Sequence, residues 1–221
     1  MEKIHVYFMP GLAASSQIFE RIELPEKQFE IHLLDWELPL INESLSAYAE
    51  RMSKLITETN PVLIGVSFGG VLVQEMAQFL KPKKVIIISS VKTNLEVPLR
   101  MKFAKSTKAY KLLPTSWLHN VELLAKYSFG NAIKSRLKLY EKYLSMREKV
   151  YLDWAIEQML LWNRTEVDKD VIHIHGTLDE VFPPKNIQNY IPVTGGTHIM
   201  ILSKYRWMNE NLPKIILENT Q

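Results

Sequence analysis

The feature that most constrains the fold is a regular alternation of short, strongly apolar runs with longer amphipathic segments. Runs rich in Val and Ile punctuate the first 90 residues and return after the middle of the chain. Such runs, four to six residues long, predict strands that are buried on both faces, as in parallel sheets. The expected strands are 4–8, 29–34, 62–66, 85–88, 171–175 and 189–193.

Helical patterns lie between these runs, at 44–59 and 69–80, and a last one spans about 204–218. We expect Pro213 to break that last helix, because proline lacks the N–H that helical hydrogen bonding needs. The alternation of strands and helices predicts right-handed crossovers. The chain is therefore expected to form an α/β fold, a mostly parallel sheet flanked by helices.

The middle of the chain has a different character. From 95 to 164 the strand signal disappears, and between Val97 and Thr165 there are 13 Lys and Arg against 5 Asp and Glu, a balance of +8. We predict one structural domain, in which 1–94 and 165–221 form the α/β core and 95–164 is a helical cap insertion. Its expected helices are 99–112, 116–127, 131–145 and 149–162. The positive charge suits an anionic part of a substrate, but a solvated basic helix face explains it more simply.

Composition excludes several classes of function. The chain of 221 residues has no cysteine, which excludes disulfides, thiolate metal sites, iron–sulfur clusters and cysteine nucleophiles. The absence of a long apolar run and of a signal-peptide pattern predicts no membrane span and a cytoplasmic location. The net charge of +3 is too small to indicate nucleic-acid binding.

Residues 65–70, Gly-Val-Ser-Phe-Gly-Gly, directly follow one of the predicted buried strands. A tight turn from strand to helix strains its central residue, and flanking glycines such as Gly65 and Gly69 avoid the resulting clash. The turn would raise the Ser67 hydroxyl above the carboxyl edge of the sheet, near the N–H groups of the helix start. We predict a nucleophile here, with a Gly-rich structural turn as the alternative. A nucleotide site is disfavoured, because neither G-x-G-x-x-G nor Gly-Lys followed by Ser or Thr occurs.

A serine hydroxyl needs a base to remove its proton, and the base needs a partner that fixes its tautomer. His198 is the only histidine in a loop just past the last predicted strand, at the edge that carries Ser67. Asp179, which follows the strand at 171–175, is the preferred partner, and Glu180 and Asp35 are its rivals.

His173 and His175 share a face of their strand by alternation. With Asp179 and His198 they would allow a metal site. Packed strand histidines are the commoner case, and we predict no metal.

These residues together resemble the α/β-hydrolases, specifically compact esterases, thioesterases and lipases. Ser67, Asp179 and His198 occur in the chain order of that family. The resemblance implies a core that lacks the family's first strands, and a helical cap. It also implies an oxyanion hole formed by the N–H groups of Phe68 and Leu12. In the loop that holds Leu12, Pro10 stands where the family has histidine.

The function implied is a serine hydrolase that cleaves a carboxylic ester or thioester through an acyl-enzyme intermediate. Its partner would be a small-molecule acyl substrate, and it needs no metal or organic cofactor. Trp117, Trp154 and Trp162 are candidates to line the substrate pocket, although packing of the cap helices onto the sheet explains each of them more simply. Acyl transfer, carbon–carbon bond hydrolysis and a catalytically silent binding protein on the same fold are the alternatives. The sequence predicts no oligomeric state.

Overall fold

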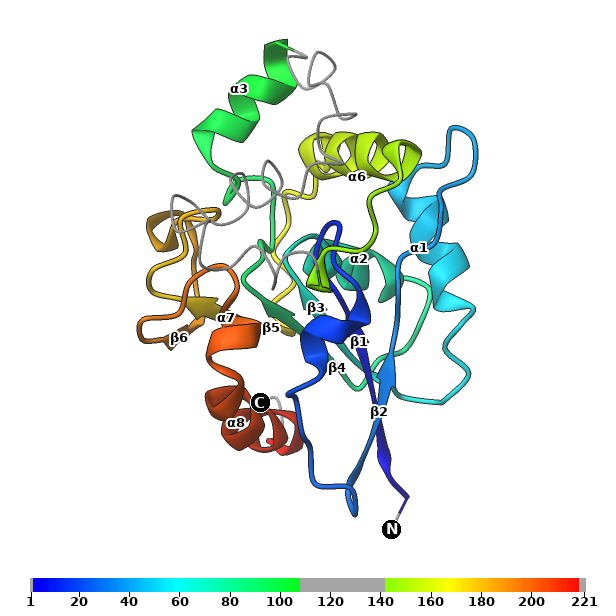
Figure 1. Ribbon diagram of the computed structural model, residues 1–221, viewed down its shortest axis with the longest axis vertical. Coiled ribbons are helices and arrows are strands. Elements are labelled where there is room, and N and C mark those ends of the chain that lie inside the picture. The colour runs from blue at the N-terminus through cyan, green and yellow to red at the C-terminus, as the bar shows by residue number, and fades with distance from the viewer. Residues whose placement is uncertain (1, 108–141, 219–221) are drawn as a thin grey trace.

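The computed structural model describes residues 2–107 and 142–218, and its centre is a six-stranded sheet in which every neighbouring pair is parallel (Figure 1). The parallel sheet expected from the sequence is therefore confirmed. The order across the sheet is β2-β1-β3-β4-β5-β6. The strands are β1 Ile4–Met9, β2 Phe29–Leu33, β3 Val62–Val66, β4 Lys84–Ile88, β5 Val171–Gly176 and β6 Ile191–Val193.

Helices flank this sheet. Helix α2 packs over β1, β3 and β4 and also against α1, whereas η1 and α8 lie on the side of the sheet nearer the viewer in Figure 1. The helices are η1 Ser16–Phe19, α1 Leu45–Ser53, α2 Phe68–Met76, α3 Leu99–Thr107, α6 Lys149–Leu161, η4 Pro184–Asn186, α7 Met200–Ser203 and α8 Tyr205–Leu217.

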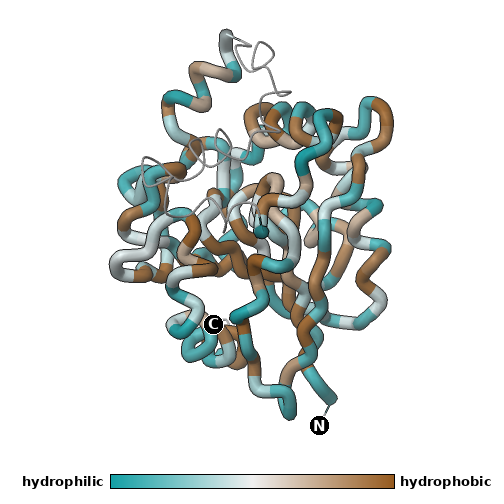
Figure 2. Tube along the Cα trace, viewed as in Figure 1, coloured by the Kyte–Doolittle hydropathy of each residue, from teal (hydrophilic) through white to brown (hydrophobic). Residues whose placement is uncertain are grey.

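The core lies between these layers. All five residues of β3 and all five of β4 are buried, as the apolar runs predicted. Figure 2 shows the hydrophobic residues concentrated along the central strands. Because these strands are buried on both faces, their sequences are continuous hydrophobic runs and do not alternate between hydrophobic and polar residues.

Three expectations about helices were wrong. The helix expected at 69–80 spans Phe68–Met76, and the residues after Met76 form turns instead. The helix expected at 44–59 ends at Ser53. β-Branched residues follow, and Asn60, which has a φ of 51°, precedes Pro61, so the chain cannot continue as a helix there. Helix α8 is not broken at Pro213 but continues to Leu217. Its apolar face is buried against the core, and this burial outweighs the one hydrogen bond that proline cannot donate.

Helices α3 and α6 lie beyond the carboxyl ends of the strands, at the top of Figure 1. The expected helices 116–127 and most of 131–145, together with Trp117, fall outside the described residues. The division into a core and a cap at 95–164 therefore stays a prediction.

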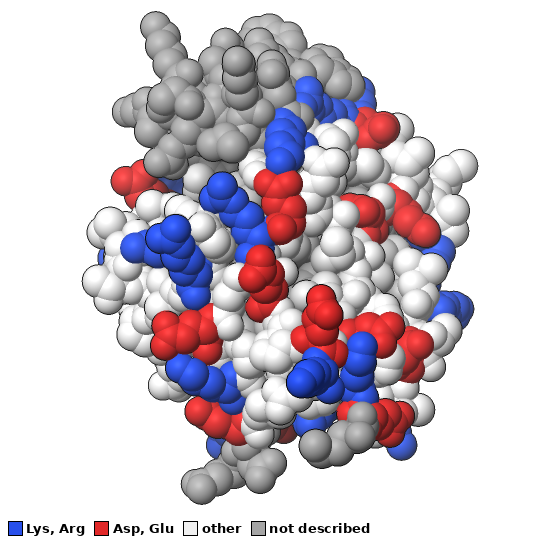
Figure 3. All heavy atoms as spheres, turned by 60° about the horizontal axis from the view of Figure 1, so that its bottom comes forward, with Lys and Arg blue, Asp and Glu red and all other residues white. Residues whose placement is uncertain are grey.

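The described surface at the bottom of Figure 1 carries basic and acidic side chains interspersed with one another, with no large patch of one sign (Figure 3). Within residues 2–107 and 142–218, no helix combines the length and the apolar character that crossing a membrane requires.

Candidate active site

Ser67 occupies the turn between β3 and α2, at the carboxyl edge of the sheet. Its backbone has φ 52° and ψ −121°, a conformation that a non-glycine residue rarely adopts and that stores strain. Added Cβ atoms at Gly65 and Gly69 would clash with the backbones of Gly69 and Pro10, so the turn closes this tightly only with glycine. The Ser90 hydroxyl donates a hydrogen bond of 2.7 Å to the Ser67 carbonyl and helps to hold the turn.

The three residues singled out in the sequence meet at this turn. His198 Nε2 lies 2.9 Å from Ser67 Oγ, and His198 Nδ1 lies 2.9 Å from Asp179 Oδ2. His198 comes from the loop after β6, and Asp179 comes from the loop after β5. The arrangement lets one ring nitrogen contact the hydroxyl while the other is held by the carboxylate.

The rivals of Asp179 have other surroundings. Asp35, after β2, accepts hydrogen bonds from the Ser16 N–H at 2.6 Å and from the Ser16 hydroxyl at 2.8 Å. Glu180 follows Asp179 directly, and its backbone carbonyl accepts a hydrogen bond from Arg100. The structure therefore brings Asp179, and neither rival, into contact with His198.

The Asp179 carboxylate is completely buried, and both of its oxygens have hydrogen-bond partners. Its Oδ1 accepts the N–H groups of Val181 at 2.8 Å and Phe182 at 2.9 Å, and its Oδ2 faces His198. Burial acts to raise the pKa of this carboxyl, but the charge and hydrogen bond of His198 and the Phe182 N–H together lower it below its ordinary value. The group is thus an anion whose negative charge is directed at the imidazole.

Two buried histidines lie behind this carboxylate. His175 Nε2 is 2.9 Å from the Phe182 carbonyl, so it carries the proton and donates. His175 Nδ1 must then accept, and it lies 3.1 Å from His173 Nε2. Burial lowers the pKa of both imidazoles, most strongly for His173, so both are neutral.

The sequence pattern predicts only a packed strand residue or a metal ligand at His175, and the structure gives it a further role. Its ring lies 3.7 Å from Asp179 Oδ2 and also holds the Phe182 carbonyl, so it supports both ends of the acid loop. A polar side chain on a buried strand, four residues before the acid, is the signal that would have indicated this.

The loop after β1 approaches Ser67 from the opposite side. A Cβ at Gly11 would lie only 3.3 Å from Ser67 Cβ. The Trp36 indole N–H donates to the Gly11 carbonyl at 2.8 Å, and the Trp36 ring stacks on Phe68 with centroids 5.2 Å apart. The Ala13 N–H donates to the Tyr151 hydroxyl of α6 at 3.4 Å. This loop is therefore fixed both by the residues after β2 and by α6.

Trp154 and Trp162, the two candidate pocket residues that the structure describes, are both buried and hydrogen-bonded. The Trp154 indole donates to the Glu43 carbonyl at 2.7 Å, and its ring contacts Phe68. The Trp162 indole donates to Glu75 at 3.0 Å. These contacts attach α6 to the core at two points, and a part for either ring in a substrate pocket stays a prediction.

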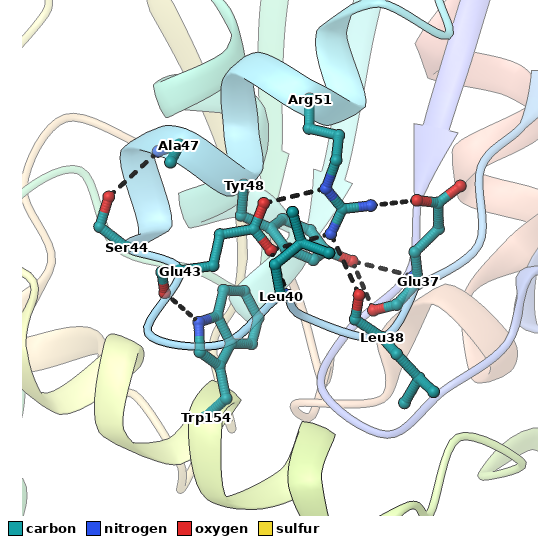
Figure 4. Close-up of polar contacts among 9 residues, drawn as sticks. All are labelled: Glu37, Leu38, Leu40, Glu43, Ser44, Ala47, Tyr48, Arg51 and Trp154. Atoms are coloured by element: carbon teal, nitrogen blue, oxygen red, sulfur yellow. Dashed lines mark hydrogen bonds and ion pairs between the residues drawn. The ribbon is translucent and has the colours of Figure 1, made fainter.

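Figure 4 shows how Trp154 joins a polar network around Arg51. The Arg51 guanidinium binds the Glu43 carboxylate through two hydrogen bonds of 2.9 Å and also contacts Glu37 and the Leu38 carbonyl. The network fixes residues 37–43, the segment between β2 and α1 on which α6 rests.

Comparisons with known proteins agree with this architecture. A hydrolase from Pseudomonas aeruginosa superposes with a TM-score of 0.75 at 12% identity, covering 98% of this chain and 91% of its own. A hydrolase from Oleispira antarctica gives 0.74 at 14% identity, with 99% and 93% covered. A thermophilic esterase from Thermogutta terrifontis gives 0.72 at 12% identity, with 96% and 89% covered.

Neither a protein-family model nor a curated protein sequence matches the chain. The structural similarity extends over nearly the whole chain and confirms the fold that the sequence motifs indicated.

Proposed function

We propose that this chain, which has the α/β-hydrolase fold, is a serine hydrolase that cleaves a carboxylic ester or thioester. The observation that carries the proposal is the hydrogen-bonded series from Ser67 through His198 to the buried Asp179. The strained turn that presents Ser67 supports it, because such strain persists where function needs it. Solved structures of the same fold include proteins described as an esterase and as hydrolases.

In the proposed reaction, His198 Nε2 takes the hydroxyl proton while Ser67 Oγ attacks the acyl carbonyl. The tetrahedral intermediate collapses, and His198 returns the proton to the departing alcohol or thiol. Water, activated by the same nitrogen, then hydrolyses the acyl-serine ester and regenerates the enzyme. The chemistry needs no metal or organic cofactor.

The Asp179 anion has two effects in this scheme. Its hydrogen bond holds the proton on His198 Nδ1, which leaves Nε2 free to act as the base. Its charge then stabilises the imidazolium that forms when the proton moves. A lowered Asp179 pKa keeps this charge in place across the physiological range.

The oxyanion would be stabilised by the N–H groups of Phe68 and Leu12. Phe68 begins α2, where the unpaired amides and the helix dipole favour negative charge. Leu12 follows Gly11, which lies against Ser67. Removal of one such donor typically lowers kcat by about 10²-fold to 10³-fold.

The acyl-enzyme also permits transfer to an alcohol in place of water. Product analysis with a competing alcohol distinguishes the two outcomes. A carbon–carbon bond hydrolase would instead cleave a diketone and leave simple esters intact, so a panel of substrates separates it from an esterase.

The proposal is tested with p-nitrophenyl esters of increasing acyl length and with acyl-coenzyme A thioesters. The wild-type chain should hydrolyse at least one of these classes, and Ser67→Ala should lose nearly all turnover while its circular dichroism is unchanged. Ser53→Ala is the matched control, because the Ser53 hydroxyl donates to the Glu50 carbonyl within α1 and takes no part in the Ser67 turn, so this variant should keep most activity. Full activity in Ser67→Ala would overturn the proposal, and no turnover of any substrate by the wild type would favour the binding-protein alternative.

A further inference from the structure

A second cluster of titratable side chains lies on β1 and the edge strand β2, apart from the candidate active site. The parallel register pairs His5 with Glu30 and Tyr7 with His32. Because alternate residues of a strand share a face, His5, Glu30 and His32 project from the same side of this strand pair. His5 lies near the start of β1, whereas Ser67 follows the carboxyl end of β3. The two sites are therefore separated along the strand direction.

The three side chains converge. His5 Nδ1 and His32 Nε2 are 2.9 Å apart, and Glu30 Oε1 is 4.0 Å from His32 Nε2. One ligand atom from each residue lies within 4.8 Å of the other two. Two imidazole nitrogens bound to one tetrahedral Zn²⁺ are about 3.3 Å apart, so the pair needs to separate by only about 0.4 Å.

We infer that His5, Glu30 and His32 form a binding site for a divalent transition-metal ion, with Zn²⁺ the best fit. Two imidazoles and one carboxylate are ligands that Zn²⁺ accepts, and three protein ligands leave a fourth position for water. Mg²⁺ and Ca²⁺ prefer oxygen ligands only and are disfavoured here.

The surroundings favour a cation over a simple histidine pair. The Tyr7 ring stacks on His32 with centroids 4.4 Å apart and an interplanar angle of 12°, which fixes the orientation of that imidazole. The Tyr7 hydroxyl in turn donates to Glu58, a second carboxylate close enough to interact with His5. The side chains of Glu30 and His32 are 49% and 26% exposed, so an ion can enter from solvent.

The site would have a structural function. A metal ion would link β1 to the edge strand β2 through side chains, in addition to the backbone ladder. An ion that binds the folded chain and not the unfolded one raises its stability by mass action. The site has no contact with Ser67 or His198, so occupancy should not alter the proposed hydrolysis.

The test uses full-length protein without an affinity tag, treated with chelator and titrated with Zn²⁺ by calorimetry and with Co²⁺ by absorption. We expect one equivalent to bind, tetrahedral Co²⁺ bands to appear and Zn²⁺ to raise Tm by several degrees. His5→Ala and His32→Ala should weaken binding by about 10-fold to 100-fold. Glu30→Gln, which changes a half-exposed side chain and should not disturb folding, should weaken it less.

His198→Ala is the matched control, because among the described residues it removes another partly exposed histidine that adjoins a carboxylate. Binding that is unchanged in His198→Ala and weakened in His5→Ala supports the site. Binding that persists in the His5→Ala/His32→Ala double variant, or no binding at about 100 µM Zn²⁺, would overturn it.

Discussion

Two aspartates follow the carboxyl ends of parallel strands, and the structure uses them differently. Asp179, after β5, is buried and binds His198, whereas Asp35, after β2, is exposed and binds the backbone and hydroxyl of Ser16. Both strands are two positions from β3 in the sheet, one on each side. The difference arises because His198 follows β6, which pairs with β5.

The two sides of Ser67 differ in the kind of polar contacts that they contain. On the acid side, formed by β5, β6 and their loops, buried polar groups bind one another in series. On the loop side, formed by β1, β2 and their loops, Trp36 and Asp35 hold backbone groups. Substitutions on the acid side should therefore lower kcat/KM strongly. Substitutions on the loop side should mainly change the local geometry of the loops and have a smaller effect on kcat/KM.

The largest difference is expected between the two aspartates themselves. Asp179→Asn should lower kcat/KM for an ester by about 10⁴-fold, because the amide no longer holds the required tautomer of His198. Asp35→Asn keeps one acceptor for Ser16 and should change kcat/KM by no more than a few fold. Steady-state kinetics of both variants, with circular dichroism as the check on folding, decides the matter. If Asp35→Asn proved the more damaging, the acid would have to be reassigned to the loop side.

The next effect is expected at His175. His175→Phe leaves the Phe182 carbonyl and the His173 Nε2–H without partners in a buried site, and each such group costs about 1–3 kcal/mol. We expect the free energy of unfolding to fall by about 2–6 kcal/mol. Because the loop that holds Asp179 loosens, kcat/KM should fall by about 10-fold to 100-fold.

His173→Phe is the matched control for that variant. His173 Nδ1 has no hydrogen-bond partner among the described residues, and the ring bonds His175 but not the acid loop. It should leave kcat/KM nearly unchanged. Equal losses of activity in the two variants would mean that His175 has no special part in positioning Asp179.

Buried neutral histidines on the acid side also predict a pH dependence of stability. Their pKa values are lower in the folded chain than in the unfolded chain, so the unfolded chain binds more protons once the pH falls below about 6.5. As the pH falls below about 6.5, the free energy of unfolding should therefore decrease by up to about 1.4 kcal/mol per pH unit for each imidazole.

Urea denaturation of the wild type and of His173→Phe at pH 7.5 and 5.5 measures this effect. The variant should lose less stability on acidification than the wild type. Identical losses in the two proteins would show that His173 is not held neutral by burial.

The smallest effect is expected at Trp36 on the loop side. Trp36→Phe removes the hydrogen bond to the Gly11 carbonyl, but that carbonyl still accepts the Ala14 N–H at 3.1 Å. Stability should fall by about 1 kcal/mol, and kcat by only a few fold. A loss of several orders of magnitude in Trp36→Phe would contradict the proposed difference between the two sides.

Much of this architecture could be predicted from the sequence, because parallel strands buried on both faces give unbroken Val and Ile runs. The Ser67 turn was also predictable, since its glycines are required locally. The choice between Asp35 and Asp179 was harder, because it depends on which strand lies beside β6, and strand order is a long-range property.

The continuity of α8 and the pairing of two histidines depend on tertiary contacts, which cannot be predicted from a local sequence pattern. Pro213 would end an isolated helix, yet burial of the apolar face of α8 carries the helix past it. Similarly, His5 and His32 are 27 positions apart, and only the register of β1 and β2 places their nitrogens together. The sequence shows both residues in strands but not that the strands are neighbours.

If Ser67 is an activated nucleophile, it should react covalently with a phosphonate electrophile. The wild-type chain should be treated with a fluorophosphonate probe and analysed by intact mass and peptide mapping. We expect a single adduct on Ser67 that is lost in Ser67→Ala and forms much more slowly in His198→Ala and Asp179→Asn. No adduct, or an adduct on another serine that persists in Ser67→Ala, would contradict it.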